Sequence, residues 1–325
     1  MPHDSSPYVP NGMEVSAPVI CVVGPTASGK SELAQCIACE MSGEIVSADS
    51  MQIYRGMDIG TGKVPVEERR VPHYGLDLVD PGEPFSAALF QTYARRCFVD
   101  IDAREKQTVL CGGTGFYVRA AIDKYDFPAG EQVGNEIRER YSALAKTEGA
   151  HALWCKLNEI DPESASLIPE NDVKRVIRAF ELLDQGKSYA SQKRALASIG
   201  QYVDALFIGL AVEPDTLRKR IDARVDSMFE QGLVHEVETL LDEGFRDGIT
   251  APQAIGYKEV VDALDGRCTL DEARETIKIS THRYAKRQRT WFRKDKRIHW
   301  IDATTLNLDD MVSAALHIID NGHCR

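Results

Sequence analysis

The sequence predicts an α/β fold: a parallel sheet flanked by helices, with an all-helical segment inserted into it. Three observations lead to this prediction. A short apolar run over 18–23 passes through a glycine-rich turn into a helical pattern, which is how a parallel sheet usually opens. Further short apolar runs alternate with helical stretches on both sides of a middle region. That region, from about 135 to 196, contains only helical patterns with polar breaks.

These patterns divide the chain into a tail, a core and an insertion. The expected parts are a flexible polar tail over 1–16, an α/β core over 17–122 and 201–325, and a helical insertion domain over 123–200.

The composition is that of a globular protein. Of the 325 residues, 43% are hydrophobic and 27% are charged, which excludes a disordered or fibrous chain. No stretch of about 18 apolar residues occurs, so no membrane-spanning helix is expected. The polar N-terminus lacks the apolar core of a signal peptide, and we therefore expect a cytoplasmic protein.

The first part of the core contains the patterns of four strands and a long helix. The expected strands cover 18–23, 44–48, 75–79 and 108–111. Ser86 can cap a helix that runs to about Arg104, with Leu89, Tyr93 and Cys97 recurring every fourth residue.

The second part of the core returns to the α/β pattern. A buried strand is expected over 205–211, and Pro214 after Glu213 is well placed in the first turn of a helix. Helical patterns continue to about Trp291, and a last strand over 298–301 precedes a closing helix.

The turn over 24–31 matches the P-loop pattern G-x-x-x-x-G-K-[ST] in its strand–turn–helix context. It consists of Gly24, Pro25, Thr26, Ala27, Ser28, Gly29, Lys30 and Ser31. Backbone N–H groups of such a turn and the helix N-terminus face phosphate oxygens. Lys30 adds a full positive charge, and the hydroxyl of Ser31 can bind Mg²⁺. The sequence therefore predicts a P-loop core that binds a diphosphate or triphosphate with Mg²⁺.

The usual partners of a hydrolytic P-loop are not evident. A nucleotide hydrolase normally has an apolar strand that ends in Asp, but the strand over 108–111 runs into Gly112, Gly113 and Thr114. The strand over 44–48 does end in an acid, Asp49. Two interpretations follow: a P-loop kinase for a nucleoside or small molecule, or an enzyme for which diphosphate is the leaving group.

Five segments together resemble the tRNA dimethylallyltransferases, also called tRNA isopentenyltransferases. They are GPTASGKS (24–31), SADSMQIYRGMDIGTGK (47–63), GGTGFY (112–117), AIGYKE (254–259) and YAKRQRTWFR (284–293). The resemblance implies transfer of a dimethylallyl group from dimethylallyl diphosphate to N6 of the adenosine 3′ to the anticodon of tRNA. It also implies Mg²⁺ as cofactor, and a P-loop core whose helical insertion helps to grip the anticodon stem-loop. No membrane and no stable protein partner is implied.

The resemblance also implies catalytic residues. Asp49 would be the general base for N6, and it follows a strand at the edge where α/β sheets place ligands. Two alternatives for Asp49 remain, a cap of the following turn and a Mg²⁺ ligand. Thr114 would contact the leaving diphosphate, although it could also be a helix N-cap. Arg224 would clamp the diphosphate, together with Arg220 on the same helix face.

The remaining expectations concern tRNA. The turn from Asp49 through Ser50 and Met51 to Gln52, with Thr114, would meet the extruded adenosine and its neighbours. By family position, Arg138, Lys174, Arg175 and Arg178 of the insertion would also contact tRNA, as would Lys286, Arg287, Gln288 and Arg293.

A cationic stripe over 283–297 fits this interpretation. It has a net charge of +7, while the rest of the chain sums to −18. Such a stripe on an acidic protein favours one polyanion-facing surface. Trp291 and Phe292 within it could stack on bases or pack in the core.

Overall fold

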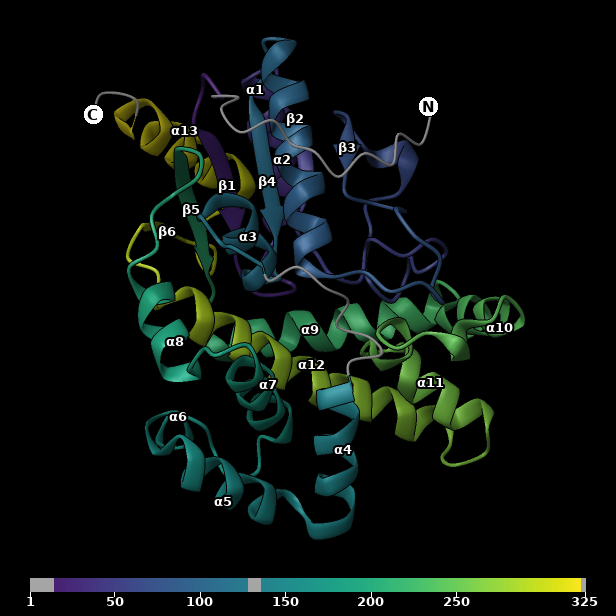
Figure 1. The fold of residues 1–325 in the computed structure, drawn as a ribbon. Coiled ribbons are helices and arrows are strands. Elements are labelled where there is room, and N and C mark those ends of the chain that lie inside the picture. Colours follow the sequence, from purple (N-terminus) through teal and green to yellow (C-terminus); the bar gives the residue numbers. More distant parts are fainter. Residues whose placement is uncertain (1–14, 128–135, 323–325) are drawn as a thin grey trace. The chain divides into compact units, whose positions relative to one another are not determined.

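The computed structural model describes residues 15–127 and 136–322. Its centre is a six-stranded sheet with the strand order β3-β2-β4-β1-β5-β6, in which every pairing is parallel. The strands are β1 (Val19–Val23), β2 (Glu44–Ser47), β3 (His73–Tyr74), β4 (Thr108–Gly112), β5 (Ala205–Ala211) and β6 (Ile298–Asp302). The predicted parallel α/β core is confirmed (Figure 1).

Helices cover the sheet and extend beyond its carboxyl edge. They are α1 (Lys30–Glu40), α2 (Ala87–Ala103), α3 (Gly115–Ile122), α9 (Pro214–Glu230), α10 (Leu233–Asp242), α11 (Tyr257–Leu264), α12 (Leu270–Phe292) and α13 (Leu308–Gly322). Short 3₁₀ turns lie at Val66–Glu68, Phe245–Asp247 and Ala251–Gln253. Side chains cap several starts: the Ser86 hydroxyl accepts a hydrogen bond from Leu89 N, as expected, and Glu213 caps α9. Within the described ranges no helix has the length and apolar character that a bilayer crossing requires.

Side chains of β1 alternate between the two faces of the sheet. Ile20 and Val22 belong to one apolar cluster, which includes side chains of α1 and α9, whereas Val19, Cys21 and Val23 belong to the other, with α2 and α3. All five are fully buried. Coverage on both faces explains why this strand reads as a continuous apolar run.

Two details of the core differ from the sequence prediction. The buried face of α2 is formed by Phe90, Ala94, Phe98 and Ile101, and Leu89 is 53% exposed, so the expected face is displaced by one position. The third strand is His73–Tyr74 rather than 75–79. It ends because Gly75 takes a left-handed φ of 79°, at a point where a Cβ would lie 2.6 Å from the Ser47 carbonyl oxygen.

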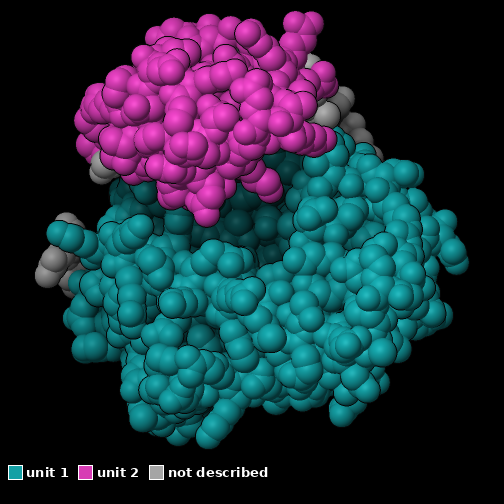
Figure 2. Space-filling model, turned by 90° about the horizontal axis from the view of Figure 1, so that it is seen from below, with its two compact units in different colours: residues 1–123, 201–325 teal, residues 124–200 magenta. Residues whose placement is uncertain are grey.

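The chain divides into two compact units, residues 1–123 with 201–325 and residues 124–200, coloured separately in Figure 2. The described part of the second unit is all-helical, as expected for the insertion. Its helices are α4 (Glu136–Glu148), α5 (Ala150–Ile160), α6 (Pro162–Ser166), α7 (Val173–Asp184) and α8 (Tyr189–Ala197). It has an apolar core of its own around Leu153, Leu157 and Phe180, and the rings of Tyr141 and Phe180 stack 3.8 Å apart.

Candidate active site

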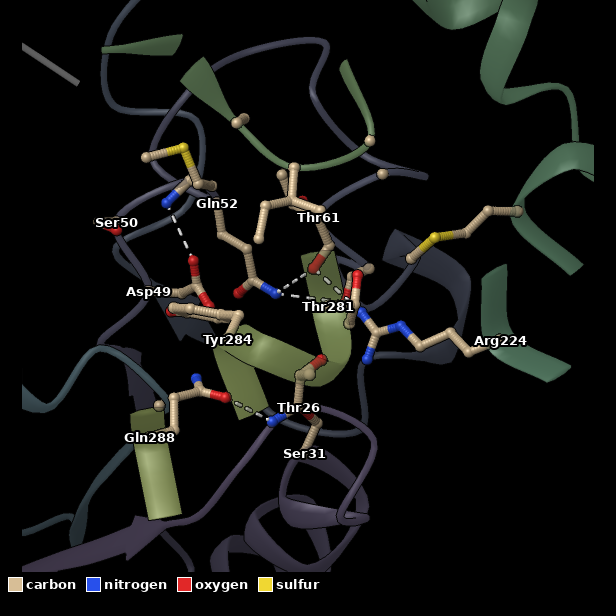
Figure 3. Close-up of a pocket in the computed structure, with 18 of the residues that line it drawn as sticks. Thr26, Ser31, Asp49, Ser50, Gln52, Thr61, Arg224, Thr281, Tyr284 and Gln288 are labelled. Carbon is tan, nitrogen blue, oxygen red and sulfur yellow. Dashed lines mark hydrogen bonds between the residues drawn. The ribbon is translucent and has the colours of Figure 1, made fainter. Parts of the chain in front are cut away.

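A cavity of about 520 Å³ opens in the first unit, where the strands β1, β2 and β4 end. Its lining comes from the P-loop, the turn after β2, the loop over 60–62, α9 and α12. Figure 3 shows Asp49, Thr26, Tyr284 and Arg224 around the same space. Its size is that of a small-molecule site, and its place outside the carboxyl ends of parallel strands is where α/β proteins bind ligands.

The P-loop brings three side chains to this cavity. Thr26, Lys30 and Ser31 line it, whereas the hydroxyl of Ser28 is buried without a hydrogen-bond partner in the described structure. Gly29 has a φ of 90° at the N-cap of α1, a conformation that glycine adopts without strain. The ammonium of Lys30 donates to the carbonyl of Pro25 over 3.4 Å. The loop therefore contributes one cation and two hydroxyl side chains to the lining of the cavity.

Lys30 and Arg224 are two of the cations that line the cavity without a carboxylate partner among the described residues. Among the described residues, no Asp or Glu oxygen lies within 4.0 Å of the nitrogens of Lys30 or Arg224. Burial lowers the pKa of both groups, and the nearby charge of Asp49 opposes this effect. Arg224 Nη2 donates instead to the carbonyl of Thr61 over 3.2 Å. Partly buried cations that are left without an anion are suited to a polyanionic ligand.

Asp49 leaves one carboxylate oxygen available. Its Oδ1 accepts a hydrogen bond from Met51 N over 2.9 Å, which is the turn-capping alternative that the sequence raised. Its Oδ2 has no partner in the described part of the chain. The ring of Tyr284 lies beside the carboxylate (Figure 3). Burial, with the charge of Asp49 second, raises the pKa of Tyr284 to about 12, so the phenol stays protonated. Tyr284 lies in a segment that resembles the family, but its role was not predicted from the sequence.

Thr114 does not line the cavity. Its Oγ1 accepts from Ser50 N over 3.1 Å and donates to Ser50 Oγ over 3.3 Å, and its side chain makes no capping bond to α3. In this structure Thr114 therefore fixes the turn that carries Asp49. Its expected contact with the diphosphate stays a prediction.

Gln288 differs most from expectation. It was predicted to contact tRNA, but it is 5% exposed and its amide is fully used. Oε1 accepts from Thr26 N over 2.9 Å, and Nε2 donates to the carbonyl of Gly113 over 2.9 Å. A Cβ on Gly113 would lie 2.4 Å from Nε2, so the bridge requires glycine there. Gln288 thus joins the P-loop to the turn after β4, so in this structure its amide is engaged within the protein. Its contact with RNA stays a prediction.

Gln52 and Arg220 also have internal partners. Gln52 Oε1 accepts from Ser47 Oγ over 2.9 Å, and its Nε2 donates to the carbonyls of Thr61 and Gly62. The amide lines the cavity but holds a loop instead of presenting both groups to a base. Arg220 does not line the cavity, because it points one turn away and donates to the carbonyl of Ala303 over 2.9 Å. In this structure the guanidinium of Arg220 is therefore held by the backbone, and its role as a second clamp stays a prediction.

The cationic stripe lies mainly on the exposed face of α12 and the turn after it. Of its residues, Arg283, Lys286, Arg287, Arg293, Lys294 and Lys296 are exposed, and none has a carboxylate within 4.0 Å among the described residues. Arg297 is the exception, since it pairs with Asp123 and Asp295. Arg283 and Arg287 also line the cavity. Trp291 is 42% exposed whereas Phe292 is buried, so the stripe presents one aromatic side chain.

The insertion's predicted cations fall into two groups. Lys174 is exposed and forms no ion pair with the described residues, and Arg175 pairs with Asp172 on its own helix. Arg138 and Arg178 both pair with the buried carboxylate of Glu181. These two arginines therefore stabilise the second unit, whatever else they contact.

Comparison with known proteins gives a consistent result. The family model "IPP transferase" matches residues 52–295, and the model "Isopentenyl transferase" matches residues 17–71. A tRNA dimethylallyltransferase of Geobacillus thermodenitrificans is 47% identical over 291 residues, which cover 88% of this chain and 90% of the relative. One of Carboxydothermus hydrogenoformans is 45% identical, with 91% and 95% covered.

Solved structures agree. The tRNA isopentenylpyrophosphate transferase of Bacillus halodurans is 41% identical with a TM-score of 0.70, and the match covers 94% of this chain and 96% of that one. A eukaryotic dimethylallyltransferase acting on tRNA is 29% identical with a TM-score of 0.79, with 95% and 80% covered. These similarities do not favour the kinase alternative. The chain belongs to the IPP transferase family, that of the tRNA dimethylallyltransferases.

Proposed function

We propose that this cavity transfers the dimethylallyl group of dimethylallyl diphosphate to N6 of the adenosine 3′ to the anticodon of tRNA. The observation that carries the proposal is that two cations without carboxylate partners, Lys30 and Arg224, line the same cavity as Asp49. Lys30 and Arg224 are suited to stabilise a departing diphosphate, and Asp49 is suited to accept a proton. The relatives named as tRNA dimethylallyltransferases supply the identity of the two substrates.

Departure of diphosphate is the first requirement. As the allylic C–O bond breaks, negative charge grows on the diphosphate and positive character grows on carbon. Lys30, Arg224 and the N–H groups at the start of α1 would stabilise that negative charge, in a cavity where electrostatic interactions are stronger than in water.

The second requirement is a better nucleophile. The lone pair of the adenine amine is delocalised into the ring, so the amine gains from losing a proton as it attacks. Asp49 Oδ2 would accept that proton while N6 bonds to the allylic carbon, and diphosphate leaves with the electrons of the C–O bond. Met51 N holds the other oxygen, which fixes the orientation of the carboxylate.

The donor set also fits magnesium held jointly with a diphosphate. No group of three His, Cys, Asp or Glu in the described residues could hold a metal ion by itself. Mg²⁺ commonly takes one or two protein oxygens, several waters and substrate phosphates. Ser31 would supply one such oxygen, with Asp49 as the nearby carboxylate. When bound, the ion would add positive charge to the diphosphate.

The stripe on α12 would bind the RNA backbone. Its exposed cations Lys286, Arg287 and Arg293 have no carboxylate partner in the described structure, so they are available to phosphates. Arg283 and Arg287 connect the stripe to the cavity, where an adenosine extruded from the anticodon loop would arrive.

The direct test is product analysis. The protein should be incubated with dimethylallyl diphosphate and an anticodon stem-loop RNA, and the RNA digest examined by mass spectrometry. We expect an adenosine that has gained one dimethylallyl group in place of a hydrogen, at the position 3′ to the anticodon. An unmodified digest, or consumption of ATP with phosphorylation of an added nucleoside, would refute the proposal.

Salt dependence tests the stripe. Replacing Lys286 by Gln should reduce the slope of log K for RNA against log salt by about 0.7–0.9, because one phosphate contact is lost. Lys278→Gln is the matched control on the same helix, since Lys278 is already paired with Asp226 and Glu275. Binding isotherms at several salt concentrations give both slopes. Equal slopes for the two variants would contradict the assignment.

A further inference from the structure

The geometry points to Glu236 as a positioning residue for the diphosphate clamp Arg224, acting through the loop over 58–62. This inference rests on the proposed function, because it concerns how that site holds its leaving group. Glu236 belongs to α10 and does not itself line the cavity.

The carboxylate of Glu236 collects four hydrogen bonds. Oε2 accepts from the backbone N–H groups of Asp58 over 3.1 Å and Ile59 over 2.8 Å, and Oε1 accepts from Gly60 N over 3.2 Å. The hydroxyl of Tyr257 donates to Oε1 over 2.6 Å. Three successive N–H groups directed at one carboxylate form a concave anion site that a side chain of the protein already occupies. Glu236 therefore fixes the outer side of the loop.

The inner side of the same loop holds Arg224. The carbonyl of Thr61 accepts from Arg224 Nη2 over 3.2 Å and from Gln52 Nε2 over 3.3 Å. The end of the loop is anchored by Lys63, whose ammonium contacts the carbonyl of Tyr54 and the carboxylates of Asp58 and Asp77. The carbonyl of Thr61 is thus the hydrogen-bond partner of Arg224 among the described residues.

Close packing transmits any shift of the loop. A Cβ at Gly60 would lie 2.4 Å from the ring of Tyr257, and a Cβ at Gly62 would lie 2.0 Å from Arg224 Nη2. The backbone is thus pressed between Tyr257 on one side and the guanidinium on the other. Tyr257 is fully buried, and burial followed by the charge of Glu236 raises its pKa, so it remains a hydrogen-bond donor.

The position of the loop determines where the guanidinium of Arg224 lies during the reaction. Displacing the loop moves Thr61, and with it the point where the guanidinium is held. Misplacement of a catalytic group by about 1 Å can lower a rate about 10²-fold. Glu236 would therefore affect diphosphate departure although it touches neither substrate.

Glu236→Gln tests this inference, because it keeps the size of the side chain but removes the charge that four donors stabilise. We expect the dissociation constant for inorganic diphosphate to rise about ten-fold and kcat to fall, while the KM for RNA is unchanged. Glu238→Gln is the control, since Glu238 lies on the same helix, is 54% exposed and, among the described residues, forms an ion pair with the neighbouring His235 alone. A loss of diphosphate affinity equal in the two variants would overturn the inference.

A double-mutant cycle separates positioning from general stability. In an Arg224→Met background, Glu236→Gln should have almost no further effect on diphosphate binding, because residues that act through one another are not additive. An undiminished effect in that background would refute the inference. If Glu236→Gln does not fold, Tyr257→Phe can replace it in the cycle with Arg224→Met, because it removes one of the four donors to Glu236. If the unmodified protein binds no diphosphate, the proposed function itself fails.

Discussion

Replacing Asp49 by Asn should lower the turnover of RNA prenylation by about 10²–10⁴-fold, the usual contribution of a positioned general base. An asparagine oxygen can still accept the hydrogen bond from Met51 N, so the turn after β2 should keep its conformation. The amide cannot take a proton from N6. Single-turnover rates with saturating dimethylallyl diphosphate and stem-loop RNA measure the effect directly.

Two controls make this result specific. Asp100→Asn changes an exposed carboxylate of α2 that pairs with Arg104 and does not line the cavity, and it should leave turnover unchanged. The affinities of Asp49→Asn for RNA and for inorganic diphosphate should remain those of the unmodified protein. Near-normal turnover would show that Asp49 only caps its turn.

The parts of the site that the sequence predicted correctly are those encoded by neighbouring residues. The P-loop is a strand, a turn and a helix within one short segment, so its composition is sufficient to identify it. Asp49 lies two residues after the end of the buried strand β2, and parallel strands bring their carboxyl ends to one edge. Spacing does not show which residues of a helix face reach the cavity: Arg220 shares a face with Arg224, but only Arg224 of the two lines the cavity.

What the sequence did not reveal depends on contacts between distant segments. Gln288 meets Thr26 across 262 positions, and Glu236 meets Gly60 across 176. Both are polar residues on helices rich in charge, which by pattern alone are expected to face solvent. A signal did exist for Gln288, because it lies on the inward side of α12, one turn from the buried Ala285 and one turn from the buried Phe292. The hydrogen-bond partners of such a side chain are evident only once the fold is known.

The insertion's arginines illustrate a related limit. Arg178 and Glu181 are three apart on α7, so their ion pair could have been anticipated from helical spacing. Arg138 reaches the same carboxylate from α4, 43 positions away. Because Glu181 is buried, its charge needs compensation, and this structural demand competes with an RNA-binding role. A basic residue in a family position is therefore weaker evidence for RNA contact than an exposed cation that has no ion pair with the described residues, such as Lys174.

Lys30→Met should lower the activity of the enzyme but raise the stability of the fold. The variant should lose about 10²–10³-fold in kcat/KM for dimethylallyl diphosphate, because it removes a charge directed at the leaving group. Its free energy of unfolding should rise by about 0.5–2 kcal/mol, since burial lowers the pKa of Lys30 and no carboxylate of the described residues compensates its charge. Steady-state kinetics and urea unfolding measure the two quantities on the same preparation.

Lys63→Met is the matched comparison for stability. Lys63 is buried and Lys30 only partly so, but Asp58 and Asp77 neutralise Lys63. Its removal leaves these partners without a counter-charge and should lower the free energy of unfolding. If Lys30→Met were destabilising as well, Lys30 would serve the fold like Lys63, and a diphosphate would not be needed to explain it. A gain in stability together with a loss of activity would mean instead that the charge of Lys30 serves a ligand. The charge would then lower the free energy of unfolding of the ligand-free protein.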